Sequence, residues 1–187
     1  VRSIQNVGLI NPPLITGEKD ETYGIVCGFQ RVEACKKLGW REIAVRVLQD
    51  KYNPFDLLKI AIWDNRSFGS LNVVAQARGI HKLSPFVPQE RHLQVFSSLL
   101  GFPANKKVFQ KIKLIGHLPE TVQIGLIEDK ISMEAAITLG KMAREDVLLL
   151  FQLLAHLKLS QNKQKEIITL ISEIAMIEEL TILDVFQ

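Results

Sequence analysis

The sequence of 187 residues has few cysteines, little net charge and no long apolar segment, and each shortage excludes a class of protein. Its two cysteines cannot form a disulfide framework, which favours a reducing, cytoplasmic setting. Apolar stretches such as 147–151 and 167–177 are interrupted by charges or fall short of the roughly 20 residues that cross a bilayer, so we expect no membrane partner. Disorder is excluded because 47% of the residues are hydrophobic. The chain opens with Val1 and not with methionine, which predicts a fragment whose first module is truncated at its N-terminus.

Charge is distributed unevenly along the chain. Residues 82–118 carry six basic side chains and one acidic side chain, whereas residues 119–187 carry 6 basic and 11 acidic ones. A basic middle segment beside an acidic C-terminal segment predicts a polyanionic partner for the middle segment alone.

The order of the predicted elements gives an α+β fold class. Within the first fifty residues, β-branched runs predict strands at 14–16, 23–27 and 43–48, and apolar residues at helical spacing predict helices at 2–7 and 29–38. From Asn53 onward the pattern is helical. The predicted helices there are 54–64, 71–83, 89–100, 106–115, 120–128, 132–141, 145–157 and a long one beginning at 160, with a short turn at 181–185.

A glycine stands between the second predicted strand and the helix that follows it. Gly28 leaves backbone N–H groups exposed at the start of that helix, and Arg31 adds a positive charge one turn further on. This arrangement is typical of a phosphate site, although the same strand–glycine–helix turn is common where nothing binds.

Residues 105–115 predict an amphipathic helix with a basic outer side. Val108, Ile112 and Ile115 share its apolar face. Because a helix at 89–100 and a turn at Gly101 precede it, the pattern predicts a helix-turn-helix whose second helix enters the major groove of DNA. Lysines would contact phosphates and Gln110 a base edge, whereas the alternative is a solvated lysine face. The candidate DNA-binding residues are Asn105, Lys106, Lys107, Gln110, Lys111 and Lys113.

Three motifs occur in a fixed order along the chain. Gly8-Leu-Ile-Asn-Pro12 precedes the strand into Cys27-Gly-Phe-Gln-Arg31, Asp64-Asn65 opens the second motif at 64–72, and residues 114–136 form the third. Together they resemble the ParB-type partition proteins, which combine a ParB/sulfiredoxin-like module with a helix-turn-helix.

The resemblance implies a DNA-binding protein of chromosome or plasmid partition, or of transcriptional control. It implies double-stranded DNA as partner, a ParA-type ATPase, a homodimer and a cytoplasmic location at the nucleoid. It also implies CTP with Mg²⁺ as cofactor. The matching nucleotide-binding residues are Gly8, Asn11, Pro12, Gly28, Arg31, Asp64 and Asn65.

This sequence departs from the family pattern at charged positions. Phe29 and Gln30 replace an acidic residue and an arginine, and Phe68 and Gly69 replace an arginine and a glutamate. Since bidentate arginines are the strong ligands of phosphates, the losses predict weak nucleotide binding and weak or absent hydrolysis.

Two alternatives remain open. One is a nucleotide-dependent phosphotransferase or phosphohydrolase at the Gly28/Asp64 site, with Glu33, Glu42 or Asp64 as the carboxylate. The other is a protein–protein module that keeps only the fold.

Sulfinic-acid reduction, the activity of sulfiredoxin, is excluded because Phe29 stands at the catalytic cysteine position of that enzyme. Cys27 and Cys35 are expected to be buried thiols. The four histidines lack ligand spacing, so no metal site is expected.

The predicted organisation has four segments. These are a ParB/sulfiredoxin-like module at 1–52, connecting helices at 53–84, a helix-turn-helix region at 85–143 and C-terminal helices at 144–187. The apolar stripes of the last segment are expected to form core or a self-association surface.

Overall fold

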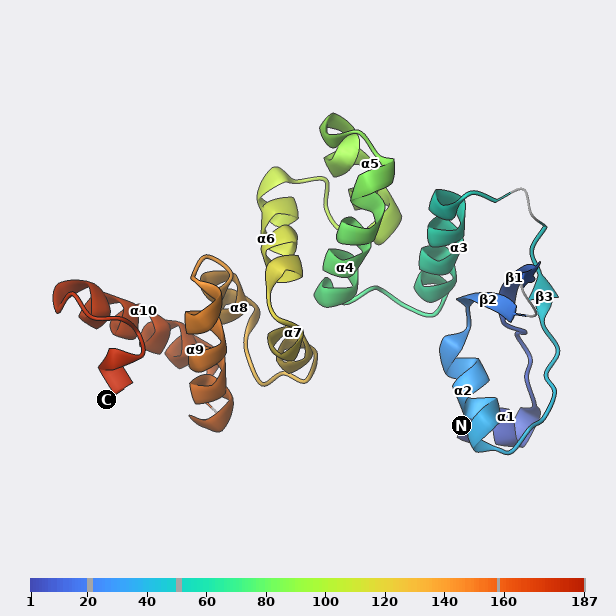
Figure 1. Cartoon of the computed structure of the whole chain (residues 1–187), viewed down its shortest axis with the longest axis horizontal. Coiled ribbons are helices and arrows are strands. Elements are labelled where there is room, and N and C mark those ends of the chain that lie inside the picture. Colours follow the sequence, from blue (N-terminus) through green and yellow to red (C-terminus); the bar gives the residue numbers. More distant parts are fainter. Residues whose placement is uncertain (20–21, 50–51, 158, 187) are drawn as a thin grey trace. The chain divides into compact units, whose positions relative to one another are not determined.

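The computed structural model describes residues 1–19, 22–49, 52–157 and 159–186. It divides the chain into two compact units, residues 1–70 and 71–187. The first unit contains the sheet and the second is helical (Figure 1). The predicted α+β class is therefore confirmed, while the four-segment division remains a prediction.

In its described residues, the first unit is a small sheet with three helices. A three-stranded sheet has the order β2-β1-β3, with β1 antiparallel to β2 and parallel to β3. Its elements are α1 (Arg2–Val7), β1 (Leu14–Lys19), β2 (Thr22–Cys27), α2 (Phe29–Lys37), β3 (Arg46–Val47) and α3 (Pro54–Ser67). Asn53 begins α3 by accepting a hydrogen bond at its side-chain oxygen from the Asp56 N–H, and Pro54 holds the first helical position.

The third strand is shorter than predicted. The sequence predicts a strand at 43–48, but only Arg46 and Val47 pair with β1. The Arg46 N–H donates to the Pro13 carbonyl and the Leu48 N–H to the Ile15 carbonyl, and β1 offers β3 only Leu14 and Ile15 as paired residues. β-branched residues favour an extended backbone, but a strand forms only where a neighbouring strand supplies hydrogen-bond partners for that backbone.

The second unit is built from helices around a core of fully buried side chains. Its helices are α4 (Val73–Leu83), α5 (His92–Leu100), α6 (Lys106–His117), α7 (Glu120–Ile127), α8 (Met133–Leu139), α9 (Arg144–Leu157) and α10 (Gln161–Ile177), with short 3₁₀ turns at Ser84–Phe86, Gln89–Arg91 and Asp184–Phe186. Leu83, Phe96, Ile115, Leu150 and Ile168 lie in that core.

Two predicted elements in this unit are present, but part of each is a 3₁₀ turn. The helix expected at 89–100 begins as the 3₁₀ turn Gln89–Arg91, and α5 starts only at His92. The short turn expected at 181–185 is a 3₁₀ turn at Asp184–Phe186, where the Asp184 carboxylate accepts from the Thr181 N–H and hydroxyl. Helix ends depend on local capping, which apolar spacing does not encode.

No helix in the described part of the chain combines the length and the apolar character needed to cross a membrane.

Candidate functional site

Arg31 is the centre of a polar cluster in the first unit. Its Nη2 donates to Asp64 Oδ2 at 2.6 Å, and its Nη1 donates to the Asn11 carbonyl at 2.9 Å and lies 3.5 Å from the Pro12 carbonyl. One guanidinium thus joins the loop before β1, helix α2 and helix α3.

Gly28 makes room for this cluster. Its φ of 94° is in the left-handed region, and a Cβ there would meet Arg31 Nε and the Pro13 Cα at 3.1 Å. A side chain at position 28 would therefore push Arg31 away from the carbonyls that it binds.

A cavity of about 330 Å³ lies beside Arg31. Of the predicted nucleotide residues, Gly8, Asn11 and Arg31 line it. The lining residues to which the sequence analysis assigned no role are Ser3, Ile4, Leu9, Ile10, Gln30, Ala34 and Phe68, together with Val1. Gln30 and Ala34 are spaced i, i+4 on α2 and therefore share one face of the helix with each other, so their spacing could have predicted part of this wall.

The remaining predicted residues do not line the cavity. Pro12, Gly28 and Asp64 contact Arg31 from outside the wall. Asn65 is exposed and lies outside both the cavity and the Arg31 cluster.

The charge of this cavity fits an uncharged group better than a triphosphate with Mg²⁺. Arg31 is the only charged side chain among the described residues that line it, and Asp64 already neutralises that charge. Ser3, Asn11 and Gln30 offer polar groups for a base or a ribose. A triphosphate carries several negative charges and needs cations that these residues do not supply.

Cys27 lies at the end of β2 and is 4% exposed. Burial raises the pKa of its thiol, and the negative charge and hydrogen bond of the Asp64 carboxylate raise it further. Cys35 is 1% exposed. Both cysteines are therefore buried thiols, as the sequence predicts, and burial opposes nucleophilic reactivity.

Two of the carboxylates considered for an enzymatic role have ion-pair partners, and the third, Glu42, is exposed and does not line the cavity. Glu33 pairs with Lys36 on the surface at 3.1 Å, and Asp64 pairs with Arg31. In the described ranges, no group of three or more His, Cys, Asp or Glu residues could hold a metal ion.

In the second unit, three phenylalanines join α5 to α6. Phe102, in the turn between the helices, stacks on Phe109 at 6.2 Å, and Phe96 of α5 lies 6.3 Å from Phe109. Gly101 ends α5 in the left-handed conformation, and its N–H and that of Phe102 donate to the Ser97 carbonyl. The aromatic contacts and the glycine cap fix α5, the turn and α6 as one structural element.

Asn105 has a structural role at the start of α6. Its side-chain oxygen accepts hydrogen bonds from the N–H groups of Lys107 at 2.8 Å and Val108 at 3.3 Å. This is an N-cap, which leaves only the side-chain NH₂ group of Asn105 to contact a ligand.

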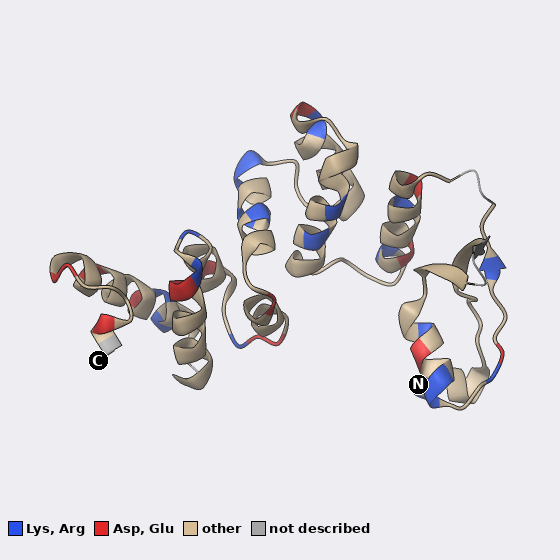
Figure 2. Ribbon diagram, in the orientation of Figure 1, with Lys and Arg blue, Asp and Glu red and all other residues tan. Residues whose placement is uncertain are grey.

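The outer face of α6 is basic and exposed. Phe109, Ile112 and Ile115 are buried against the unit, whereas the side chains of Lys106, Lys107, Gln110 and Lys111 are exposed. Lys and Arg are marked on α6 in Figure 2, and no acidic residue occurs between Glu90 and Glu120.

The four lysines of α6 differ in their partners. Lys106 and Lys107 have no ion-pair partner among the described residues. Lys111 Nζ pairs with Glu134 of α8 at 3.1 Å, and Lys113 Nζ lies 5.9 Å from the Phe109 ring centroid. The first two lysines are therefore the most available to an anion.

Residues 1–65 match the family profile described as the ParB N-terminal domain. The resemblance to ParB-type partition proteins is confirmed. The Arg31 cluster and its cavity lie within the residues that match the ParB domain, apart from Phe68, whereas α6 lies beyond them.

The chain is also similar to nucleoid occlusion proteins. It is 30% identical to that of Lysinibacillus sphaericus over 133 residues, which cover 70% of this chain and 42% of the relative. It is 28% identical to the protein of Oceanobacillus iheyensis over 148 residues, which cover 78% of this chain and 49% of the relative. It is 25% identical to the protein of Bacillus thuringiensis over 172 residues, which cover 91% of this chain and 57% of the relative. The chain thus spans about half the length of these relatives.

Two solved structures of C-terminally truncated ParB from Caulobacter crescentus are also similar. The complex with the centromeric parS site has a TM-score of 0.47 and 22% identity, covering 89% of this chain and 84% of that one. The complex with CTP-γ-S has a TM-score of 0.32 and 23% identity, covering 81% of each chain.

Proposed function

We propose that the second unit binds double-stranded DNA through α6, as part of a ParB-like protein of chromosome or plasmid partition or of transcriptional control. The observation that carries the proposal is the exposed lysine face of α6, with Lys106 and Lys107 free of carboxylate partners in the described chain. The α5–turn–α6 element would be the helix-turn-helix, with α6 as the helix that enters the major groove.

The charges near α6 favour a polyanionic ligand over a lysine face that only water contacts. Lys111 has only a surface pair with Glu134, in which the two side chains are 47% and 59% exposed. Such a pair contributes about 0–1 kcal/mol, so a DNA phosphate could replace the carboxylate at little cost. Gln110 is exposed between the lysines and can donate to and accept from a base edge.

The test is a triple substitution, Lys106→Ala/Lys107→Ala/Lys111→Ala. We expect weaker binding to duplex DNA and a salt dependence whose slope falls by about 0.9 for each phosphate that the protein no longer neutralises. The matched control is Lys141→Ala/Lys163→Ala/Lys165→Ala, which removes the same charge from exposed positions elsewhere in this unit. Equal binding and equal salt slopes for the two triple variants would contradict the proposal.

For the first unit, we infer a cavity suited to a nucleoside, with CTP and Mg²⁺ remaining a prediction. The support is the position of Gly8, Asn11 and Arg31 around one cavity within the ParB-matching residues. Calorimetry with CTP, with and without Mg²⁺, followed by assay of phosphate release, tests binding and the enzymatic alternative together. Phosphate release that Arg31→Ala abolishes would favour the enzyme.

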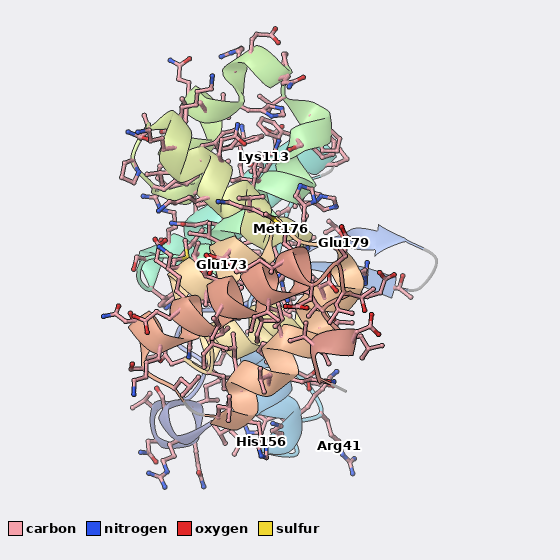
Figure 3. All side chains as sticks on the ribbon, turned by 90° about the vertical axis from the view of Figure 1, so that its left-hand side faces the viewer. Arg41, Lys113, His156, Glu173, Met176 and Glu179 are labelled. Atoms are coloured by element: carbon pink, nitrogen blue, oxygen red, sulfur yellow. The ribbon has the colours of Figure 1, made fainter. Side chains whose placement is uncertain are left out.

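The remaining partners are proposed with the family role. We propose a ParA-type ATPase, a homodimer and a cytoplasmic location at the nucleoid as parts of it. The support for self-association is an exposed apolar side of α10, which runs across the front of Figure 3, where Met176 is labelled. Sedimentation of the native chain and of Leu170→Glu/Ile177→Glu would test it, with a lower mass expected for the variant.

A further inference from the structure

We propose that Asp64 determines the specificity of the cavity in residues 1–70. Its carboxylate holds the guanidinium of Arg31, so that the cavity favours an uncharged ligand, such as a nucleoside, over a nucleoside triphosphate. The inference refines the cavity proposed above and is independent of DNA binding by α6.

Both Nη atoms of Arg31 already donate to oxygens within the protein. A guanidinium binds phosphate through its parallel N–H groups. In this chain Nη2 donates to Asp64, and Nη1 donates to the Asn11 carbonyl and lies 3.5 Å from the Pro12 carbonyl. A phosphate that bound through both Nη atoms would compete with these oxygens.

The position of the ion pair opposes that displacement. The side chains of Arg31 and Asp64 are 19% and 23% exposed, and their N–O distance is 2.6 Å. Partly buried charges attract each other more strongly than surface charges, because less water screens them. Opening the pair would also leave the Asp64 carboxylate partly buried and without its cation, which is unfavourable.

The other lining side chains do not offset a polyanion. Arg31 and Asp64 together carry no net charge, and the polar side chains of the lining, Ser3, Asn11 and Gln30, are neutral. The phosphates of a triphosphate would lose water without gaining a free cationic side chain among the described lining residues. A base and a ribose need only apolar contacts and a few hydrogen bonds, and this lining supplies both.

The test compares cytidine with CTP on the native chain and on Asp64→Asn, each with and without Mg²⁺ and in the absence of DNA. Tryptophan fluorescence is a suitable signal, because both tryptophans, Trp40 and Trp63, belong to the first unit. Asp56→Asn is the matched control, since it removes the carboxylate of another ion pair of the first unit, the one with Lys59. The double variant Asp64→Asn/Arg31→Ala removes the freed cation as well.

We expect the native chain to bind CTP no more tightly than cytidine. In Asp64→Asn the affinity for CTP should rise about tenfold or more, the gain of one charged hydrogen-bond partner, while that for cytidine stays the same. Asp56→Asn should behave like the native chain, and the double variant should lose the gain.

Two results would overturn the inference. One is a native chain that binds CTP more than about tenfold tighter than cytidine, since the phosphates would then find a cation. The other is a folded Asp64→Asn chain that gains no affinity for CTP. If Asp64→Asn does not fold, the ratio of CTP to cytidine affinity in the native chain decides, because it needs no variant. DNA binding is tested separately, by the substitutions of the α6 lysines, and its outcome does not bear on this inference.

Discussion

Arg78 of α4 donates from its Nε to the side-chain oxygen of Gln123 in α7 at 2.9 Å. Gln123 is 6% exposed, and its Nε2 donates to the carbonyls of Ile115 and Leu118 at the end of α6. One buried amide therefore links α4 and α7 to the C-terminal end of the proposed DNA-binding helix.

Replacing Gln123 should destabilise the second unit. Gln123→Leu would leave the Leu118 carbonyl without its donor, whereas the Ile115 carbonyl still accepts from the Leu118 N–H, and we expect a cost of about 1–3 kcal/mol in the free energy of unfolding. Urea unfolding followed by helical circular dichroism measures it. The exposed Gln110→Leu is the control, and an equal effect of both variants would contradict the role of Gln123.

Releasing Lys111 should strengthen DNA binding. Glu134→Gln removes the carboxylate that pairs with Lys111, and we expect a gain of about 0.2–1 kcal/mol in DNA affinity, shrinking as salt screens the charges. Fluorescence anisotropy with a labelled duplex at two salt concentrations measures the gain. Glu145→Gln makes the same charge change on α9, and an equal gain there would show that Lys111 is not involved.

Gln110 should affect base preference and the lysines should not. In Gln110→Ala we expect discrimination at one base position to fall by about 1–3 kcal/mol, because the shorter side chain cannot reach the base edge. Lys106→Ala should weaken binding to all sequences alike. Selection from a randomised duplex pool compares the two variants. An unchanged preference in Gln110→Ala would mean that α6 contacts phosphates alone.

Gly28 should tolerate substitution less well than Gly39. Both have positive φ, but a Cβ at Gly28 meets Arg31 Nε and Pro13 at 3.1 Å, whereas a Cβ at Gly39 meets nothing within 4 Å. Backbone strain alone costs each alanine variant about 1–2 kcal/mol. Gly28→Ala should lose more free energy of unfolding than Gly39→Ala, because it also disturbs the Arg31 cluster. Urea unfolding followed by tryptophan fluorescence measures both losses. Equal losses would refute that close approach.

The first unit should lose stability at alkaline pH through Cys27. Because its pKa in the folded chain is raised by burial and by Asp64, folding favours the neutral thiol. This contribution is complete below the ordinary value of 9.0 and is lost as the pH rises through the folded value. Unfolding of the native chain from pH 7 to pH 10, followed by tryptophan fluorescence, should show the loss. Cys27→Ser lacks the thiol and should show a smaller decline.

The local structure could be predicted where one short pattern decides it. The spacing of Val108, Ile112 and Ile115 predicts α6, Asn53-Pro54 predicts the start of α3, and Gly28 predicts the turn into α2, since capping and amphipathic burial act over a few residues. The 43–48 strand was predicted too long because its backbone partners lie on β1.

The sequence by itself determined which residue types this protein has for binding anions: a glycine and an arginine at the start of one helix, and lysines along another. Only the tertiary structure decided which of these cations are available. Asp64, 33 residues after Arg31 in the chain, neutralises Arg31, whereas Lys106 and Lys107 have no such partner in the described chain. Ion pairs form between side chains that folding brings within a few ångströms, and the separation of charges along a sequence does not reveal that distance.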